Sequence, residues 1–447
     1  MLKAQQLTLA VLVNAALIST AFASEQSEAQ GFVEDAKGSV LFRTGYIHRD
    51  KTNYIENGTN DEKQVTDTSS AAQSAIVKLE SGFTKGVIGF GVNVTGDASF
   101  KLGSNNNAGN GMIPRETGIN DKGELQKGIG DTYDHWARGG ASVKARVSNT
   151  TVEYGTQVLD IPVLASNTAR MVPEYFTGVL AKSREIENLE LVAGKFTKDQ
   201  YSDQIDSDGR HLDNAIIWGA NYKFNDQLNT SYYGLDSENA LERHYINANY
   251  TLPLAEKRSL TLDFNGYHTE WDKEAGTYSS TKGNKNVEGR SNSIWSLAGT
   301  LNQGAHSVML AYQQNTGNTG YDYGENADGA QSIYVANSYL SDFIGNHEKS
   351  AQVQYNLNFA DYGVPGLNWT SAFVYGWDIK VNNSAKEGQE REFFNQVKYT
   401  AQSGFAKDAS LRVRHSYYRA SDNYQAGNYI GDTNEWRLFL DIPVKLF

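Results

Sequence analysis

The feature that most restricts the fold of this 447-residue chain is a strict alternation of apolar and polar side chains. In residues 351–359 every odd position is apolar, and every even position is glutamine or asparagine. The same period of two recurs in residues 215–224, 259–269 and 367–377. Alternation sustained over about ten residues predicts β-strands that have one apolar face and one polar face.

The segments between the expected strands alternate between short and long. Eight connections are short, at 81–85, 149–150, 184–187, 225–226, 253–258, 303–305, 360–365 and 402–408. Nine others are mostly long, with 236–242 as the brief exception: 50–72, 96–137, 159–175, 197–212, 236–242, 270–291, 316–347, 379–391 and 420–434. Seventeen connections imply 18 strands, from near Ser39 to Phe447. Short periplasmic turns and long extracellular loops are typical of transmembrane antiparallel β-barrels, which indicates an all-β fold of that kind.

The first residues have the layout of a secretory signal peptide. Lys3 precedes a mainly apolar run over residues 7–18, and Ala21-Phe22-Ala23 supplies small residues before a cleavage site. We therefore expect a signal peptide at 1–23, cleavage near Ala23/Ser24, and a single barrel domain at 24–447. Beyond residue 23 no apolar run has the length of a membrane-spanning helix, and the mean hydropathy is −0.54. These observations exclude a helical membrane protein.

An exported soluble β protein is the competing interpretation, as a sandwich, a β-helix or a propeller. The sequence has no internal repeat of about 20–50 residues, which weighs against propellers and β-helices. A sandwich does not require that all long connections fall at one end. A barrel of about 18 strands instead encloses water, which the polar strand faces would line. The 26 tyrosines and seven tryptophans are expected in girdles at the two membrane surfaces rather than in a sugar-binding site.

Charge and motifs exclude several classes of function. The net charge of −12 makes nucleic acid a poor partner, because binding it requires a basic surface. The absence of cysteine rules out disulfide scaffolds, thiolate metal sites and cysteine nucleophiles. The eight histidines show no HExxH spacing, and no G-x-S-x-G elbow is present. We expect no enzyme activity, no cofactor and no metal site.

Several motifs, in order along the chain, resemble one family. They are Gly31-Phe32-Val33-Glu34-Asp35, Leu41-Phe42-Arg43-Thr44-Gly45-Tyr46, Glu80-Ser81-Gly82-Phe83-Thr84, Arg138-Gly139-Gly140-Ala141, Ser332-Ile333-Tyr334-Val335-Ala336-Asn337-Ser338, Tyr362-Gly363-Val364-Pro365-Gly366-Leu367 and Asn434-Glu435-Trp436-Arg437-Leu438. Together they resemble the OprD-type substrate-specific porins, also called outer-membrane carboxylate channels. The resemblance implies an 18-stranded barrel whose third long loop folds into the pore, with the seventh lining the constriction. It also implies a diffusion channel for small carboxylate-bearing solutes, among them amino acids, small organic acids and β-lactams such as carbapenems, guided by a cationic wall.

The parity of charged residues within the strands gives an independent test of such a wall. Arg43 and Arg49 have the parity opposite to the apolar face of the first strand. Six further cations also alternate with apolar residues and are expected to face the lumen: Lys144, Arg146, Lys398, Arg412, Arg414 and Arg437. Once a barrel closes, the first strand and the last three lie side by side, so six of the eight cations cluster on one wall. Fixed cations offer a carboxylate many weak, exchangeable sites. The alternative is that they pair with acids and keep the bore wet.

Candidate constriction residues come from the two long loops. In the third loop they are assigned by position alone: Asp160, Ser166, Asn167 and Arg170. In the seventh loop Ser338 and Asp342 match polar and acidic residues of the family, whereas Gln331 stands where an acid is expected. That departure weakens the case for basic amino acids as substrates. For each of the four third-loop residues, a loop-packing role is at least as good an interpretation.

The expected partners are small anionic or zwitterionic solutes together with outer-membrane lipid and lipopolysaccharide. The expected location is the bacterial outer membrane, as a monomer or a weak homotrimer. Two alternatives stay open from the sequence. One is a hydrolase built into an outer-membrane barrel, and the other is a receptor or adhesion barrel whose loops bind macromolecules.

Overall fold

The computed structural model describes residues 24–447 except 58–59, 106, 121, 209–211, 273–288, 325–331, 383 and 427–429. The side chains of residues 53–57 and 60–64 are also outside the description. The expected signal peptide, residues 1–23, and Gln331 lie outside the described residues. In the described part of the chain, no helix has the length and apolarity needed to cross a membrane.

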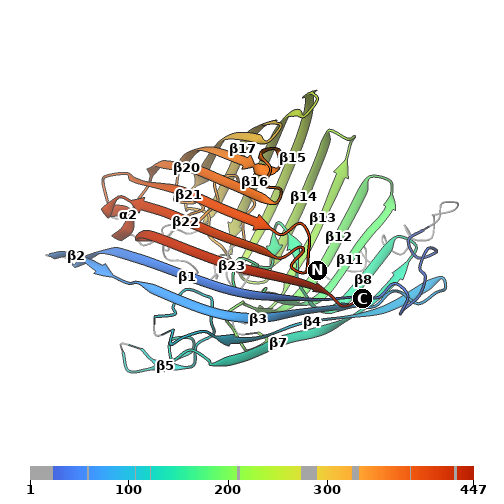
Figure 1. Cartoon of the computed structure of the whole chain (residues 1–447). Helices are drawn as coiled ribbons and strands as arrows, with labels where there is room; N and C mark the ends of the chain where they lie inside the picture. The colour runs from blue at the N-terminus through green and yellow to red at the C-terminus, as the bar shows by residue number, and fades with distance from the viewer. Residues whose placement is uncertain are drawn as a thin grey trace.

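A single antiparallel sheet closes on itself to form a barrel (Figure 1). It contains 19 strands, of which β2 (Asn60–Val65) pairs only with β1, so 18 strands form the wall. The wall strands are β1 (Lys37–Asn57), β3 (Thr68–Glu80), β4 (Ile88–Lys101), β7 (His135–Val147), β8 (Thr150–Gln157), β11 (Tyr175–Ile186), β12 (Leu189–Gln200), β13 (Ala215–Lys223), β14 (Leu228–Ser237), β15 (Leu241–Ala255), β16 (Arg258–Trp271), β17 (Ser291–Gln303), β18 (His306–Gly317), β19 (Lys349–Asn358), β20 (Leu367–Ile379), β21 (Gly388–Thr400), β22 (Ser410–Ala420) and β23 (Asp432–Lys445).

The barrel closes between its first and last strands, which lie side by side in Figure 1. β1 pairs with β23 in one uninterrupted register, from Ser39 opposite Lys445 to Thr52 opposite Asp432. Closure matters because an open sheet edge in hydrocarbon would leave backbone groups unpaired, at several kcal/mol each. The prediction of an 18-stranded antiparallel barrel is confirmed.

The predicted loop 50–72 is wrong. β1 runs on to Asn57 and β2 pairs back along it, so most of this segment is a hairpin that extends the wall. The physical reason is that the hairpin satisfies its own backbone ladder, while its side chains are mainly polar at successive positions. Such a sequence lacks the apolar alternation by which the other strands were found. Elsewhere the observed bounds differ from the predicted ones by a few residues.

The remaining elements are small and lie in the connections. They are the hairpin β5 (Gly118–Ile119) and β6 (Leu125–Gln126), the hairpin β9 (Asp160–Ile161) and β10 (Leu164–Ala165), the 3-10 turn η1 (Phe359–Tyr362) and the one-turn helix α2 (Asp422–Ala426). The β9–β10 hairpin belongs to the connection between β8 and β11.

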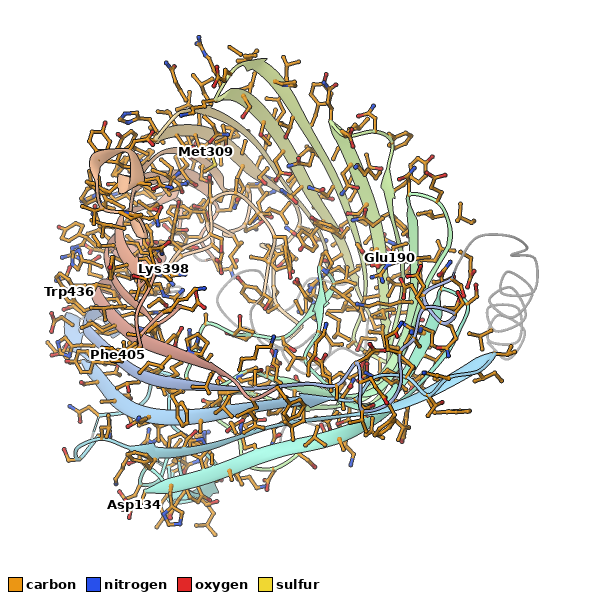
Figure 2. The ribbon with its side chains drawn as sticks, turned by 45° about the vertical axis from the view of Figure 1, so that its right-hand side comes forward. Asp134, Glu190, Met309, Lys398, Phe405 and Trp436 are labelled. Carbon is orange, nitrogen blue, oxygen red and sulfur yellow. The ribbon has the colours of Figure 1, made fainter. Side chains whose placement is uncertain are left out.

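The two faces of the wall follow from strand parity. In β23, Trp436, Leu438 and Leu440 are exposed, whereas Arg437 and Phe439 between them are buried. Trp436 lies on the outer side of the wall in Figure 2. A row of exposed aliphatic and aromatic side chains fits a surface covered by lipid. The intervening residues face the lumen, where loops cover them.

The connection between β8 and β11, residues 158–174, crosses the lumen and is called the third loop below. Near its start, Leu159, Ile161 and Leu164 pack in a buried cluster with inward side chains of β11 to β17. Near its end, Met171 and Val172 pack in a second cluster with inward residues of β1, β3, β7 and β23: Ile47, Ile76, Trp136 and Phe439. Burying apolar surface on two opposing walls holds the loop inside the barrel. This placement agrees with the prediction that the third loop folds into the pore.

Candidate functional site

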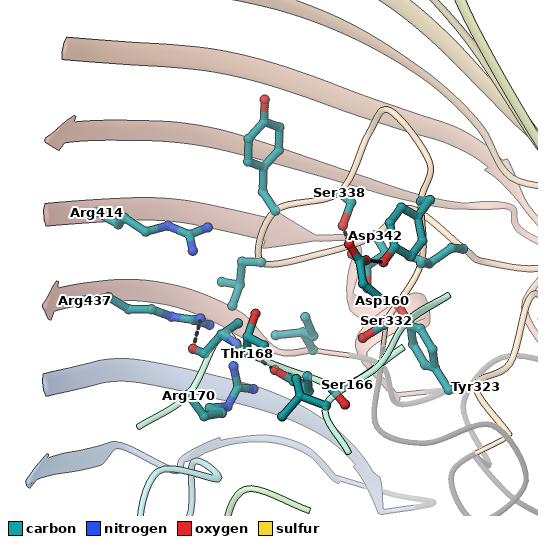
Figure 3. A pocket seen from close by; sticks show the side chains of 18 of the residues that line it. Asp160, Ser166, Thr168, Arg170, Tyr323, Ser332, Ser338, Asp342, Arg414 and Arg437 are labelled. Atoms are coloured by element: carbon teal, nitrogen blue, oxygen red, sulfur yellow. Dashed lines mark hydrogen bonds between the residues drawn. The ribbon is translucent and has the colours of Figure 1, made fainter. Parts of the chain in front are cut away.

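The lumen contains a cavity of about 930 Å³, called the constriction cavity below (Figure 3). Its lining comes from the third loop and from the connection between β18 and β19, residues 318–348, which is the seventh loop. Strands β1, β3, β22 and β23 and Ile430 of the connection between β22 and β23 complete it. The two loops and one side of the wall therefore enclose the narrow part of the channel.

One side of the constriction cavity is basic. The lining of the cavity contains six cationic side chains but only two aspartates, Asp160 and Asp342. The six cations are Arg49 and Lys51 from β1, Lys78 from β3, Arg170 from the third loop, Arg414 from β22 and Arg437 from β23. Strand parity explains most of this concentration, because the inward positions of four neighbouring strands carry five of the six cations. Figure 3 shows Arg414 and Arg437 extending from the wall toward the loops.

Acids on the wall neutralise some of these cations. Glu435 accepts hydrogen bonds from Arg49 Nε at 2.6 Å and from Arg437 Nη2 at 3.0 Å, with Arg437 Nε also bonded to it. Asp441 pairs with Arg43 at 2.7 and 3.0 Å, and the remaining Arg43 nitrogen donates to the Arg170 carbonyl at 3.0 Å. For these three arginines, pairing with an acid accounts for much of the side chain's contacts.

Other cations have no such partner. Among the described residues, no carboxylate lies within ion-pair distance of Arg412, Arg414 or Arg170. The Arg412 guanidinium lies 5.2 Å from the centre of the Phe439 ring, and that of Arg414 lies 5.0 Å from the Phe394 ring. Cation–π contacts orient a guanidinium without cancelling its charge. Burial lowers the pKa of Arg170, and the positive charges of Arg437 and Arg49 act in the same direction.

The opposite side of the constriction cavity is formed by hydroxyl and carboxylate groups. Asp342 accepts hydrogen bonds from the hydroxyls of Ser338 and Tyr323, and Asp160 accepts one from the hydroxyl of Tyr334. The two loops also meet at Tyr267 of β16. Its hydroxyl donates to the Pro162 carbonyl at 3.1 Å and accepts from the Tyr334 amide at 3.1 Å. The cavity is therefore polarised, with arginines facing acidic and hydroxyl groups.

The structure brings nine of the sequence-derived candidates together in the constriction cavity: Arg49, Asp160, Ser166, Asn167, Arg170, Ser338, Asp342, Arg414 and Arg437. Two of them have contacts that also suit loop packing. Ser166 forms two hydrogen bonds of 2.9 Å with the backbone of Leu159, one through its own backbone N–H and one through its hydroxyl. The backbone N–H of Asn167 donates to the Glu174 carboxylate at 2.7 Å.

Five candidates lie outside the lining. Arg43, Lys398 and Arg412 occupy inward positions of the same wall, nearer the short turns. Lys144 and Arg146 lie on β7 instead, 4.9 and 4.1 Å from the Phe83 ring. Arg146 also donates to Gln26 at 3.1 Å, in the segment that precedes β1. These two cations are separated from the row formed by β1, β22 and β23.

Several residues that line the constriction cavity were not among the sequence-derived candidates. Lys51 has the parity of Arg49, and Lys78 lies between Val77 and Leu79, so the same pattern could have identified both. Thr168, Tyr323 and Tyr334 lie in irregular loops, where strand parity carries no information. Within the described ranges, no group of three or more histidine, aspartate or glutamate side chains is arranged to hold a metal ion.

Comparison with known proteins gives the family. The family model described as 'outer membrane porin, OprD family' matches residues 30–446. The chain belongs to this family. Porin D of Pseudomonas aeruginosa is 36% identical, over 96% of this chain and 95% of that protein. The crystal structure of OccAB1 of Acinetobacter baumannii has 67% identity and a TM-score of 0.85, over 95% of this chain and 100% of that one.

The improved crystal structure of OprD of Pseudomonas aeruginosa has 33% identity and a TM-score of 0.75, and covers 96% of this chain and 100% of that one. This OprD-family protein is therefore a porin of the bacterial outer membrane that serves the uptake of small solutes. Its relatives are channels rather than enzymes. The comparisons give no support to a barrel enzyme or to a receptor barrel.

Proposed function

We propose that this OprD-family porin favours small solutes that bear a carboxylate, including amino acids and small organic acids. The observation that carries the proposal is the polarised constriction cavity, in which Arg414 and Arg170 lack a carboxylate partner among the described residues. A solute carboxylate supplies that partner, and the planar guanidinium matches it in a bidentate arrangement. β-Lactams such as carbapenems, which also bear a carboxylate, use the same route in this proposal.

The arrangement along the wall suits passage rather than tight binding. Arg414, Arg412 and Lys398 occupy inward positions of two adjacent strands and continue from the constriction cavity toward the short turns. Lys398 is exposed to the lumen, and Arg412 and Arg414 are half-buried. Such a series of cations gives an anion several weak sites, between which it can exchange. The driving force is the gradient of the solute itself.

Zwitterionic solutes fit the same cavity in one orientation. Their carboxylate would face Arg414 and Arg170, and their ammonium group would face Asp342 and Asp160 across the cavity. Outside the barrel, the exposed apolar belt would contact outer-membrane lipid and lipopolysaccharide.

The test is the replacement of Arg412 and Arg414 together by glutamine, followed by liposome swelling with a carboxylate and with an uncharged sugar of similar size. An exposed charge pair contributes up to about 1 kcal/mol, so each arginine accounts for roughly two- to fivefold in carboxylate flux. The double variant should lose carboxylate flux by roughly two- to fivefold for each arginine removed, and its sugar flux should stay unchanged.

Arg391→Gln is the matched control, because Arg391 lies at an exposed, outward position of β21. This control should leave both fluxes unchanged. Discrete conductance steps in planar bilayers would verify that each variant forms a pore. If the double variant slowed the sugar as much as the carboxylate, the arginines would have no guiding role.

A further inference from the structure

A buried ion pair lies behind the third loop, away from the constriction cavity. Arg138 of β7 donates to Asp97 of β4, from Nη2 at 2.9 Å and from Nε at 3.4 Å. Both side chains have an exposure of 0%. The Tyr175 hydroxyl also donates to Asp97 at 2.9 Å, and the Arg138 guanidinium lies 5.0 Å from the centre of the Tyr175 ring.

The rest of the Arg138 guanidinium holds two loops. Nη2 donates to the Pro173 carbonyl at 2.7 Å, near the end of the third loop. Nη1 donates to the Tyr201 carbonyl at 2.5 Å, at the start of the connection between β12 and β13. One side chain therefore fixes two loop backbones to the barrel wall. The pair with Asp97 balances its charge in a place where water is excluded.

Arg170 is only three residues before Pro173. The two residues between Arg170 and Pro173 are Met171 and Val172, which have an exposure of 0% and pack against Ile47 and Trp136. The short connection leaves little freedom between the Arg138 anchor and Arg170. The carbonyl of Arg170 itself accepts a hydrogen bond from Arg43 at 3.0 Å. The place of the Arg170 side chain in the constriction cavity thus depends on backbone contacts outside that cavity.

We propose that Arg138 and Asp97 are positioning residues for the constriction, which act by placing Arg170. Neither residue lines the constriction cavity, so neither contacts a solute there. Their effect on selectivity passes through the Pro173 carbonyl and the third loop. This inference rests on the proposed preference for carboxylates.

The test is a cycle of variants: wild type, Arg138→Gln, Arg170→Gln and the double variant. The quantity measured is the ratio of carboxylate flux to uncharged-sugar flux in liposome swelling, with the closed barrel verified by its heat-modifiable migration in gels. Arg138→Gln should lower the ratio several-fold, by about as much as Arg170→Gln. The double variant should lower it no further than Arg170→Gln does alone. A residue that only stabilises the fold would not produce this dependence on Arg170.

Arg243→Gln is the matched control. Arg243 is another arginine with only 1% exposure, but it donates to the Asp322 carbonyl of the seventh loop at 2.6 Å and to Thr269 at 2.9 Å. Any change of the flux ratio caused by Arg243→Gln should add to that of Arg170→Gln. Arg138→Lys should recover part of the wild-type ratio. If Arg138→Gln does not form a closed barrel, Asp97→Asn serves in its place in the same cycle.

A wild-type ratio in Arg138→Gln would overturn the proposal, and so would an equal additional loss in the Arg170→Gln background. Failure of the proposed function has a different signature, namely a wild-type channel with no carboxylate preference. In that event the single-channel conductance tests whether Arg138 positions Arg170. Arg138→Gln should change the conductance of the wild type and leave that of Arg170→Gln unchanged; any other result would refute it.

Discussion

Replacement of Tyr267 by phenylalanine removes one hydroxyl that joins the third loop to the seventh. Tyr267 lies on β16 with an exposure of 3%, so the ring belongs to the wall. Its hydroxyl donates to Pro162 of the third loop and accepts from the Tyr334 amide of the seventh loop. The aromatic ring keeps its packing in the variant, so the two hydrogen bonds are what changes.

The size of the effect follows from these two bonds. A hydrogen bond in a protein contributes a net of about 0.5–1.5 kcal/mol, so two bonds contribute about 1–3 kcal/mol. That free energy corresponds to a factor of roughly 5–150 in the equilibrium between docked and undocked loops. We therefore expect the undocked state to become populated enough to appear as extra conductance levels and greater open-channel noise.

The assay is single-channel recording in planar bilayers, and Tyr245→Phe is the control. The Tyr245 hydroxyl donates to Asn265 at 2.6 Å, between two neighbouring wall strands, and does not join the loops. Tyr245→Phe should record like the wild type. Quiet, wild-type records from Tyr267→Phe would show that the two loops do not depend on this hydroxyl for their docking.

Two further predictions concern packing and pH. An alanine Cβ at Gly45 of β1 would collide with Met171 of the third loop and come within 2.8 Å of the Phe439 ring, so Gly45→Ala should lower the single-channel conductance. The control is Gly299→Ala, whose Cβ would meet only Leu262 at 3.6 Å and should leave the conductance unchanged. Equal conductance of the two variants would contradict this prediction. Burial and then the charge of Glu390 raise the pKa of Glu348, just before β19, well above its ordinary value. The folded state therefore keeps a proton that the unfolded chain releases, so the urea midpoint of the wild type should fall as the pH rises from about 5 to 8, and less so in Glu348→Gln. A wild-type midpoint that stays constant over that range would refute the assignment.

The wall could be predicted from the sequence because lipid and water impose opposite requirements on successive residues. In β23 the outward positions are Trp436, Leu438 and Leu440, and this pattern fixes the inward position of Arg437. Eighteen strands and the lumen-facing cations follow from that one rule. The rule did not identify the outer part of β1, because residues 51–57 are mainly polar, and there the predicted loop was wrong.

The candidate site could be predicted only in part, since its lining joins strands to irregular loops. The hydrogen bonds of Asp342 with Ser338 and Tyr323 bring together residues 4 and 19 positions apart in one connection. No spacing rule gives such contacts, because loops have no fixed period. The buried pair of Arg138 and Asp97 joins β7 to β4, and the sequence alone does not reveal that its remaining donors reach Pro173 and Tyr201.

The row of inward arginines combines two physical roles that parity cannot separate. Arg49, Arg43 and Arg437 are bonded to Glu435 or Asp441, which share the inward parity of β23. Arg49 and Arg437 share the single carboxylate of Glu435, so removal of either arginine leaves that acid paired with the other. Removal of Arg43 would instead leave Asp441 without its partner, as an acid in the pore that repels carboxylates. Arg412 and Arg414 lie against aromatic rings instead, and no carboxylate of the described residues is within ion-pair distance of them. Loss of Arg43 should therefore reduce carboxylate flux by adding repulsion, whereas loss of Arg414 should reduce it by removing attraction.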